Sequence, residues 1–122
     1  MNVKILQAKP ELPKWAFALL NQLYEIERKL KLHGDTGNAL RNVEKMKDAL
    51  EDVGLFYEDP MGQAFKETRT DLEATISGSD TENLHVVEVI KPIIRQGKRD
   101  FSVVLQKGIV VIESKQIEKP NK

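Results

Sequence analysis

Apolar residues recur at helical spacing in the segment KWAFALLNQLYEIERKLKL, directly after Pro13. Residues three and four positions apart share one side of a helix, so this spacing predicts a helix over residues 14–32. Pro13 suits the start of a helix, and Glu27 and Lys31 form an i,i+4 pair in the favourable order. One apolar stripe consists of Trp15, Leu19, Leu23, Ile26 and Leu30, and Phe17, Leu20 and Tyr24 widen it. The first two turns are therefore apolar on more than one side, which a single thin domain would struggle to cover.

A second helical pattern covers residues 39–53 and follows the turn sequence HGDTGN. The turn offers Asp35, Thr36 or Asn38 as a cap for the helix that follows. The positions that recur at spacings of three and four in this second pattern are Leu40, Val43, Met46 or Lys47, Leu50 and Val53. Gly54 followed by Leu55 is typical of a helix C-terminal cap with its apolar contact. Residues 14–55 are therefore predicted to form a helical hairpin.

The hydrophobic period then changes from helical to alternating. Leu72, Ala74 and Ile76 alternate with polar residues, which predicts a half-buried strand that ends at the turn SGSDTEN. LHVVEVI predicts a further strand, and Pro92 interrupts it, because proline cannot donate to a strand ladder and favours an edge or a bulge. RQGKRD predicts a turn into FSVVLQ, and the pair KG separates that run from IVVIE.

The predicted fold class is α+β, with the helical hairpin followed by a small antiparallel β-domain. We expect a loose lead-in over residues 1–13, the hairpin over 14–55, the β-domain over 56–116 and a flexible tail over 117–122. The pattern contains no internal repeat and no long linker.

Composition narrows the class of function. The 122 residues suffice for one domain or two small halves, and 40% hydrophobic with 31% charged residues is typical of a folded chain. Lys plus Arg (19) equals Asp plus Glu (19), so no global field attracts nucleic acid or an anionic membrane, and we expect neither as a partner. No apolar run reaches the length of a membrane span or a signal peptide, so we expect a cytoplasmic protein.

No motif for catalysis or metal binding is present in the sequence. Cysteine is absent, and His33 and His85 do not stand at metal-ligand spacing. The acidic pairs Glu51–Asp52 and Glu58–Asp59 could serve acid/base or hard-cation chemistry, but they fit better as residues that solvate and bound the second helix. We therefore expect a protein that is not an enzyme and has no cofactor and no metal.

The turn RQGKRD is the strongest local concentration of positive charge that could meet a partner. Arg95, Lys98 and Arg99 could pair with phosphates or with a carboxylate patch on another protein. The alternative is a solvated hairpin tip, which is the ordinary role of a charged turn. The interleaved aromatic residues of single-strand nucleic-acid sites are missing, since Phe101 stands alone beside the turn.

Five motifs in chain order resemble the C-terminal part of the GrpE family of nucleotide exchange factors for DnaK-type chaperones, over residues 16–113. LLNQLYEIERKL resembles the end of the family's long helix, and NVEKMKDALEDVGL is similar to its next helix, GVxxIxxQLxxALxxxGV. GQAF matches the loop that enters the family's sheet. VVEVI and VVLQKGIVVIE resemble the strands VxEV and RVLRPAxVxV.

The chain departs from the family at several positions. FKETRTDLEA replaces the pattern FDPxxHEA, so the family's histidine has no counterpart. The Gly-Tyr pair after VxEV becomes Pro92-Ile93, and the basic residues of RVLRPA fall on Val103 and Gln106. The N-terminal half of the family's long helix also has no counterpart.

The resemblance implies a homodimer in which two helices from each chain form a four-helix bundle, with the β-domain projecting from it. The implied dimer interface consists of Trp15, Leu19, Leu20, Leu23, Tyr24, Ile26, Leu30, Leu40, Val43 and Leu50. The implied function is release of ADP from a DnaK-type chaperone through binding of its ATPase domain. The implied partner-binding residues are Arg95, Lys98, Arg99, Lys107 and Gly108. The alternative is an exchange-inactive, GrpE-like dimeric adaptor for another protein.

Overall fold

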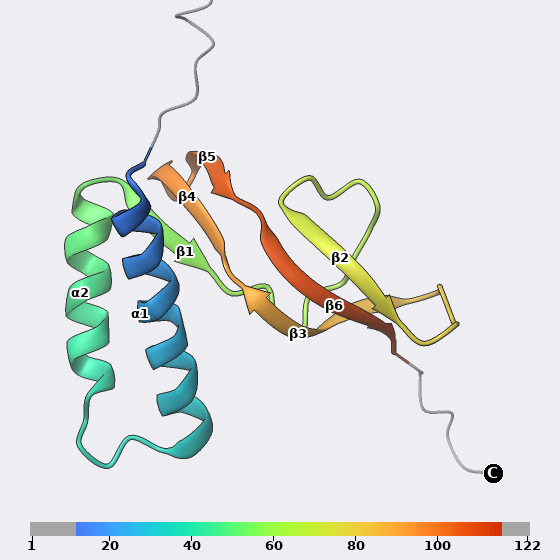
Figure 1. Ribbon diagram of the computed structural model, residues 1–122, viewed down its shortest axis with the longest axis horizontal. Helices are drawn as coiled ribbons and strands as arrows, with labels where there is room; N and C mark the ends of the chain where they lie inside the picture. Colours follow the sequence, from blue (N-terminus) through green and yellow to red (C-terminus); the bar gives the residue numbers. More distant parts are fainter. Residues whose placement is uncertain (1–11, 116–122) are drawn as a thin grey trace, which may run out of the picture.

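The computed structural model describes residues 12–115, which form a helical hairpin followed by two small β-sheets (Figure 1). The elements are α1 (Lys14–His33), α2 (Leu40–Asp52), β1 (Leu55–Glu58), β2 (Leu72–Ser77), β3 (Leu84–Lys91), β4 (Ile93–Lys98), β5 (Phe101–Gln106) and β6 (Gly108–Ser114). The predicted α+β class is confirmed. The lead-in predicted over residues 1–13 lies outside the described residues except for its last two positions, and the tail predicted over 117–122 lies wholly outside them.

Local sequence signals fix the helical hairpin. α1 begins after Pro13, whose backbone is extended, and it ends at Gly34, whose amide donates back into the last turn. The carboxylate of Asp35 accepts hydrogen bonds from the backbone amides of Ala39 (2.6 Å) and Leu40 (2.9 Å) at the start of α2. The first amides of a helix have no partner within the helix, and Asp35 supplies one. Asp35 is thus the capping residue among the three that the sequence offers.

The strands form two sheets where the sequence predicts one antiparallel sheet. The first sheet has the order β1-β4-β5 and is antiparallel. The second has the order β2-β6-β3, and its β2 runs parallel to β6 (Figure 1). β6 takes the central place because it is strongly apolar, with Val110 and Ile112 both buried. In β2 only Leu72 is buried, so the predicted half-buried alternation is wrong for Ala74 and Ile76, which no element covers.

The chain passes between the two sheets at two neighbouring points. β3 leads into β4 through the buried Pro92, and β5 leads into β6 through Lys107. The side-chain amide of Gln106 donates to the carbonyl of Pro92 at 2.9 Å and forms two reciprocal hydrogen bonds with the amide of Asn21 on α1, at 2.9 and 3.1 Å. Pro92 therefore marks a change of sheet, and α1 is tied directly to this junction.

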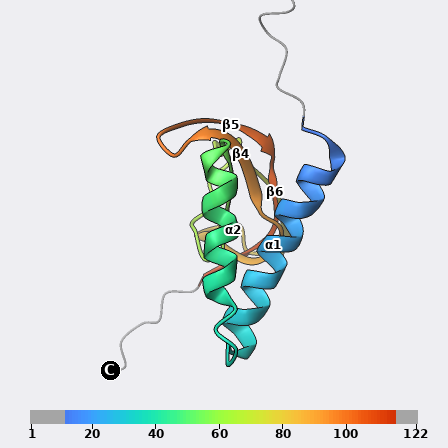
Figure 2. The same ribbon diagram turned by 90° about the vertical axis from the view of Figure 1, so that its left-hand side faces the viewer.

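One apolar core joins the helices to both sheets. Figure 2 shows α1 and α2 side by side against the strands. The buried core residues are Leu20, Leu23, Tyr24, Val43, Leu55, Tyr57, Leu72, Val86, Val89, Ile93, Ile94, Val110 and Ile112. The prediction that Leu20, Leu23, Tyr24 and Val43 meet a second copy is therefore wrong. The chain's own strands cover these four side chains, which leaves them 0–3% exposed.

The other residues of the predicted dimer interface lie nearer the surface. Trp15, Leu19 and Ile26 have exposed fractions of 67%, 48% and 45%. Leu30, Leu40 and Leu50 are half-buried. The apolar residues of α1 therefore lie on two sides of the helix. One side packs in the core of this chain, and the other faces solvent.

The end of α2 meets β4 at two glycines. Gly54 has φ +84°, which suits its place after the helix, and its carbonyl accepts the amide of Gly97 at 2.8 Å. Gly97 has φ +131°, and a Cβ atom at this position would lie 2.5 Å from the carbonyl oxygen of Phe101 and 2.9 Å from Cα of Ser102. Both the backbone conformation and the close approach of β5 therefore require glycine at position 97.

Gly97→Ala should lower the free energy of unfolding by about 2 kcal/mol or more, because the new methyl group collides with backbone atoms in addition to straining φ. Gly62→Ala is the matched control, since Gly62 has φ +82° but no atom within 4 Å of an added Cβ. This control should cost about 1 kcal/mol. Urea unfolding measures both values, and equal losses would contradict the role of close packing at Gly97.

Candidate functional site

The tip of the β4–β5 hairpin carries two of the predicted partner-binding residues, and one of them is held by this chain. Arg99 donates to both carboxylate oxygens of Glu51 on α2, from Nε at 2.9 Å and from Nη2 at 3.3 Å. Its guanidinium also lies 4.4 Å from the ring centre of Phe56. The hydrogen bond from Arg99 lowers the pKa of Glu51. Lys98 is exposed and forms no ion pair within residues 12–115, so it is the cation that the tip presents to solvent.

Arg95 forms its hydrogen bonds with acidic residues of this chain and is mostly shielded from solvent. Its Nε donates to Glu58 at 2.7 Å and its Nη2 to Asp71 at 3.2 Å, and its side chain is 21% exposed. Asp71 also accepts two hydrogen bonds from Arg69 at 3.0 Å, and these bonds lower the pKa of Asp71. The four side chains link β1 and β4 to the start of β2. Arg95 is therefore engaged within the chain and does not reach the tip.

Lys107 and Gly108 lie at the other end of β5 from the tip. They do not form a hairpin turn, because β5 continues into β6 across the junction between the sheets. Lys107 is exposed, but Gly108 is buried against Leu72 and Ile93, where an added Cβ would lie 2.8 and 3.0 Å from their side-chain atoms. Gly108 is thus a packing residue, and a partner at the tip would not touch it.

Two apolar residues beside the tip were not among the predicted site residues. Phe101 is 85% exposed and Val103 is 48% exposed. They stand two positions apart on β5, so their side chains share one face of a strand at the edge of its sheet. The alternation F-S-V after the turn is the signal in the sequence, but it does not tell whether another element covers the strand. Lys98, Phe101 and Val103 together form the surface that we call the tip surface.

A buried carboxylate connects the helices to β1. Glu27 is 7% exposed, and its Oε1 accepts a hydrogen bond from Tyr57 at 2.7 Å. Its Oε2 lies 3.1 Å from Nζ of Lys47 and 3.2 Å from Nζ of Lys31, so the predicted pair with Lys31 is present. Tyr24 packs edge-on against Tyr57, with the ring centres 5.8 Å apart.

The charge states in this network follow from its hydrogen bonds. Burial alone raises the pKa of Glu27, but the hydrogen bonds from Tyr57, Lys47 and Lys31 outweigh it, and the pKa lies below its ordinary value. Burial and the hydrogen bond to Glu27 raise the pKa of Tyr57. Glu27 is therefore an ionised and fully partnered group, which suits a structural role rather than proton transfer.

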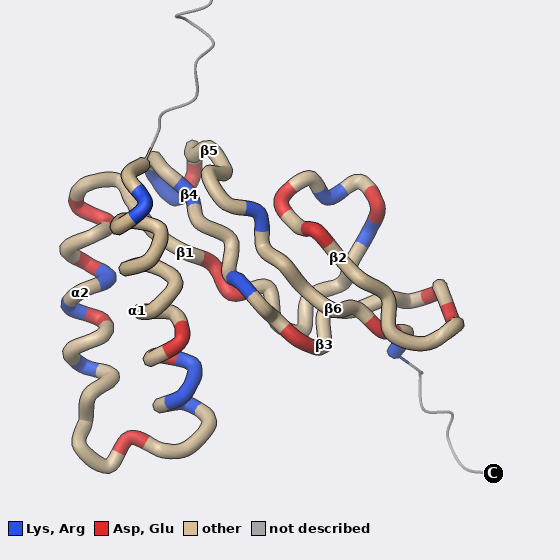
Figure 3. The backbone as a smooth tube through the Cα atoms, viewed as in Figure 1, with Lys and Arg blue, Asp and Glu red and all other residues tan. Residues whose placement is uncertain are grey.

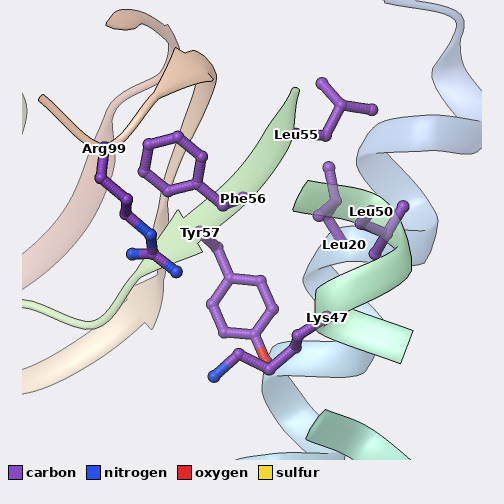
Figure 4. A pocket seen from close by; sticks show the side chains of 7 residues that line it. All are labelled: Leu20, Lys47, Leu50, Leu55, Phe56, Tyr57 and Arg99. Atoms are coloured by element: carbon purple, nitrogen blue, oxygen red, sulfur yellow. The ribbon is translucent and has the colours of Figure 1, made fainter. Parts of the chain in front are cut away.

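One of the cavities next to this network is too small for a substrate. It lies between α2 and β1, and Figure 4 shows Tyr57 and Lys47 on one side of it and Phe56 with Arg99 on another. Its volume is about 10 Å³, which is room for one water molecule at most.

The residues considered for acid/base or metal chemistry have other contacts. Glu51 and Glu58 pair with the two arginines described above, and Asp59 accepts the amide of Met61 at 3.0 Å. His33 is exposed, and Nδ1 of His85 lies 3.1 Å from the carbonyl of Asn83. Within residues 12–115, no three His, Cys, Asp or Glu side chains gather as a metal site.

Comparison of the chain with models of protein families, with curated proteins and with solved structures gave no match. Neither helix within the described residues combines the length and the apolar character that a membrane span requires.

Glu27→Gln should lower the free energy of unfolding by about 2 kcal/mol at pH 7, because hydrogen bonds to a buried charge are stronger than those to a neutral amide. The pKa of Glu27 lies below the ordinary value of 4.5. Its stabilisation is therefore fully present above this value and is lost as the pH falls through the folded-state pKa. The difference between the unchanged protein and the variant should shrink in urea titrations below pH 4.5.

Glu44→Gln is the matched control for this experiment. Glu44 also pairs with Lys47, at 3.5 Å, but its side chain is 58% exposed. The change should cost less than about 0.5 kcal/mol at any pH. A cost for Glu27→Gln that stays constant from neutral pH to about pH 3 would contradict the ionised state of Glu27 in the folded chain.

Proposed function

We propose that this protein is a GrpE-like co-chaperone that binds the ATPase domain of a DnaK-type chaperone and promotes release of ADP. The support is the position of the motifs that resemble the family. LLNQLYEIERKL lies in α1, NVEKMKDALEDVGL runs through α2 into β1, VVEVI lies in β3, and VVLQKGIVVIE covers β5 and β6. The motifs thus fall on a helical hairpin followed by strands, in the order that the resemblance implies, and this agreement carries the proposal.

The proposed activity needs binding energy but no covalent chemistry. A protein that binds the opened form of a nucleotide cleft more tightly than the closed form shifts the chaperone toward the opened form. The tip surface is suited to this role, because Phe101 offers a large apolar contact and Lys98 a free charge beside it. Aromatic residues at the centre of an interface commonly supply much of the binding energy.

The same proposal includes a homodimer built on the helices. Trp15, Leu19 and Ile26 recur at spacings of four and seven residues, which brings them to one side of α1. All three are exposed in the single chain. A second copy that packs its own α1 and α2 on this side would bury them in a four-helix bundle with two-fold symmetry.

The alternative function is a dimeric adaptor that has the GrpE-like arrangement but binds another protein. Two observations favour it. Arg95 and Arg99 are engaged with acidic residues of their own chain, and the basic positions of the family's RVLRPA strand fall on Val103 and Gln106. An adaptor would still use the tip surface, but its partner would not be the ATPase domain.

Addition of this protein to a DnaK-type chaperone loaded with a fluorescent ADP analogue should accelerate release of the analogue. Phe101→Ser should reduce the affinity for the chaperone about tenfold, because an exposed aromatic anchor is lost while the core is untouched. Stopped-flow fluorescence over a range of protein concentrations measures both effects.

Lys66→Glu is the control for the exchange experiment, because Lys66 is exposed in the loop before β2, away from the hairpin tip. It should leave the release rate unchanged. A folded protein that gives no acceleration at any concentration would exclude exchange and favour the adaptor.

Leu19→Glu should convert the dimer to a monomer without unfolding it, because the charge enters the shared helical surface and not the core of one chain. Val103→Glu is the matched control, since Val103 has the same exposed fraction of 48% but lies on β5. Sedimentation velocity measures the mass of each variant. A mass for Leu19→Glu equal to that of the unchanged dimer would exclude this side of α1 as the interface.

A further inference from the structure

β3 contains two bulges, and each one turns an apolar side chain outward. Val86 faces Ile112 across the sheet and Glu88 faces Val111, so Val87 is an extra residue without a partner. A second register shift between Val89 and Lys91 leaves Ile90, like Val87, without a partner residue on β6. Val87 and Ile90 are 41% and 51% exposed. Bulges of this kind re-aim side chains and are frequent beside functional sites.

Val87 lines a surface groove between β3 and α1. The apolar part of the groove also includes Leu32 at the end of α1 and Met61 in the turn after β1, with exposed fractions of 67% and 55%. The groove has a volume of about 320 Å³, in contrast to the 10 Å³ cavity in the core. It can therefore accept large apolar side chains from a partner.

The groove lies on a different side of α1 from the proposed dimer interface. Leu32 follows Ile26 by six residues, which turns its side chain about 120° around the helix axis. A partner could therefore occupy the groove while a second copy covers Trp15, Leu19 and Ile26.

The two walls of the groove carry opposite charges. Arg28 and Lys31 lie on α1, whereas Asp59 lies in the turn after β1 and Glu88 on β3. Asp59 also accepts a hydrogen bond from the hydroxyl of Tyr24 on α1 at 3.4 Å. Figure 3 shows basic positions near the end of α1 and acidic positions on β3 and in the turn after β1. Arg28 also pairs with Glu25 at 2.6 Å and Lys31 with Glu27 at 3.2 Å. The side chains of both cations are exposed, and ion pairs of exposed groups contribute little free energy, so a carboxylate of a partner can share them.

The edge of β3 that faces away from β6 cannot pair with an added strand, because backbone groups along it already have partners. The amide of Val86 donates to the carbonyl of Gln63 at 2.9 Å, and the carbonyl of Val86 accepts the amide of Gly62 at 3.0 Å. Ala64 forms a further bridge with His85. Since these bonds and the bulges interrupt the edge, a ligand of the groove must be recognised through its side chains rather than through its backbone.

We propose that this groove binds a short amphipathic helix of a partner protein. The apolar face of the helix packs on Leu32, Met61 and Val87. Acidic side chains on one flank meet Arg28 and Lys31, and basic side chains on the other flank meet Asp59 and Glu88. Binding here is independent of nucleotide exchange and can be measured without a chaperone.

The test uses two fluorescein-labelled helical peptides with the same leucine face. The mixed peptide carries Glu on one flank and Lys on the other, and the acidic peptide carries Glu on both flanks. Fluorescence anisotropy with the full chain should show saturable binding of the mixed peptide and weaker binding of the acidic one. Glu88→Lys should abolish this preference, because the new cation offsets Asp59 and leaves this wall of the groove without net negative charge.

Val87→Ser should weaken binding of the mixed peptide about tenfold, which corresponds to the loss of one buried aliphatic contact. Ile90→Ser is the matched control, since Ile90 is also an exposed bulge residue but does not line the groove. It should leave the affinity unchanged.

Three outcomes would overturn the proposal. The first is no saturable binding of the mixed peptide, and the second is an equal loss of affinity in the two serine variants. The third is a change of Val87→Ser from dimer to monomer in sedimentation velocity, which would make the groove an interface between copies of this chain.

Discussion

The buried carboxylate of Glu27 fixes the relation between the helices and the strands, and the outer surfaces depend on it. It joins α1 to α2 through Lys47 and to β1 through Tyr57. A buried charge without partners is strongly unfavourable, so α1 cannot rotate about its axis without losing these bonds. The orientation of α1 about its axis is therefore fixed. This orientation determines which side of the helix enters the core, which side exposes Trp15 and Leu19, and which side faces β3.

The tip of the β4–β5 hairpin is also anchored to the rest of the chain by specific contacts. Arg99 is clamped between Glu51 and Phe56, and Gly97 is bonded to the end of α2. These contacts restrain the base of the tip, and a restrained surface loses less conformational freedom when it binds. The same interactions thus hold Arg99 against its own chain, while Lys98 and Phe101 beside it stay exposed.

The helical hairpin could be predicted from the sequence because its signals are local. The apolar spacing, the cap at Asp35 and the glycine at position 54 all act within a few residues of one another. The pairing of strands could not be predicted. An alternating pattern such as that from Leu72 to Ile76 predicts a strand but does not indicate which other strand it pairs with. The GrpE-like function stays a prediction.

The candidate surfaces were harder to predict for the same reason. An apolar stripe on α1 indicates burial but not whether the same chain or a second copy supplies the cover, so Leu20 and Leu23 were assigned to the wrong partner. The spacing of Glu27 and Lys31 in a helix predicts an ion pair on the surface. The tyrosine that donates a hydrogen bond to Glu27 lies 30 residues further along the chain, so the local pattern does not indicate that Glu27 is buried. The bulges at Val87 and Ile90 depend on the register with β6, which no local pattern encodes.

The central place of β6 also sets an order for folding. β2 and β3 are neighbours in the chain but do not pair with each other, because β6 lies between them. During synthesis the helices and the first sheet have all their strands once β5 has left the ribosome, whereas the second sheet has no ladder until β6 follows. β2 must wait without a strand partner, and β3 with only its hydrogen bonds to residues 62–65. We therefore expect the pairing of both strands with β6 to be a late and comparatively slow step.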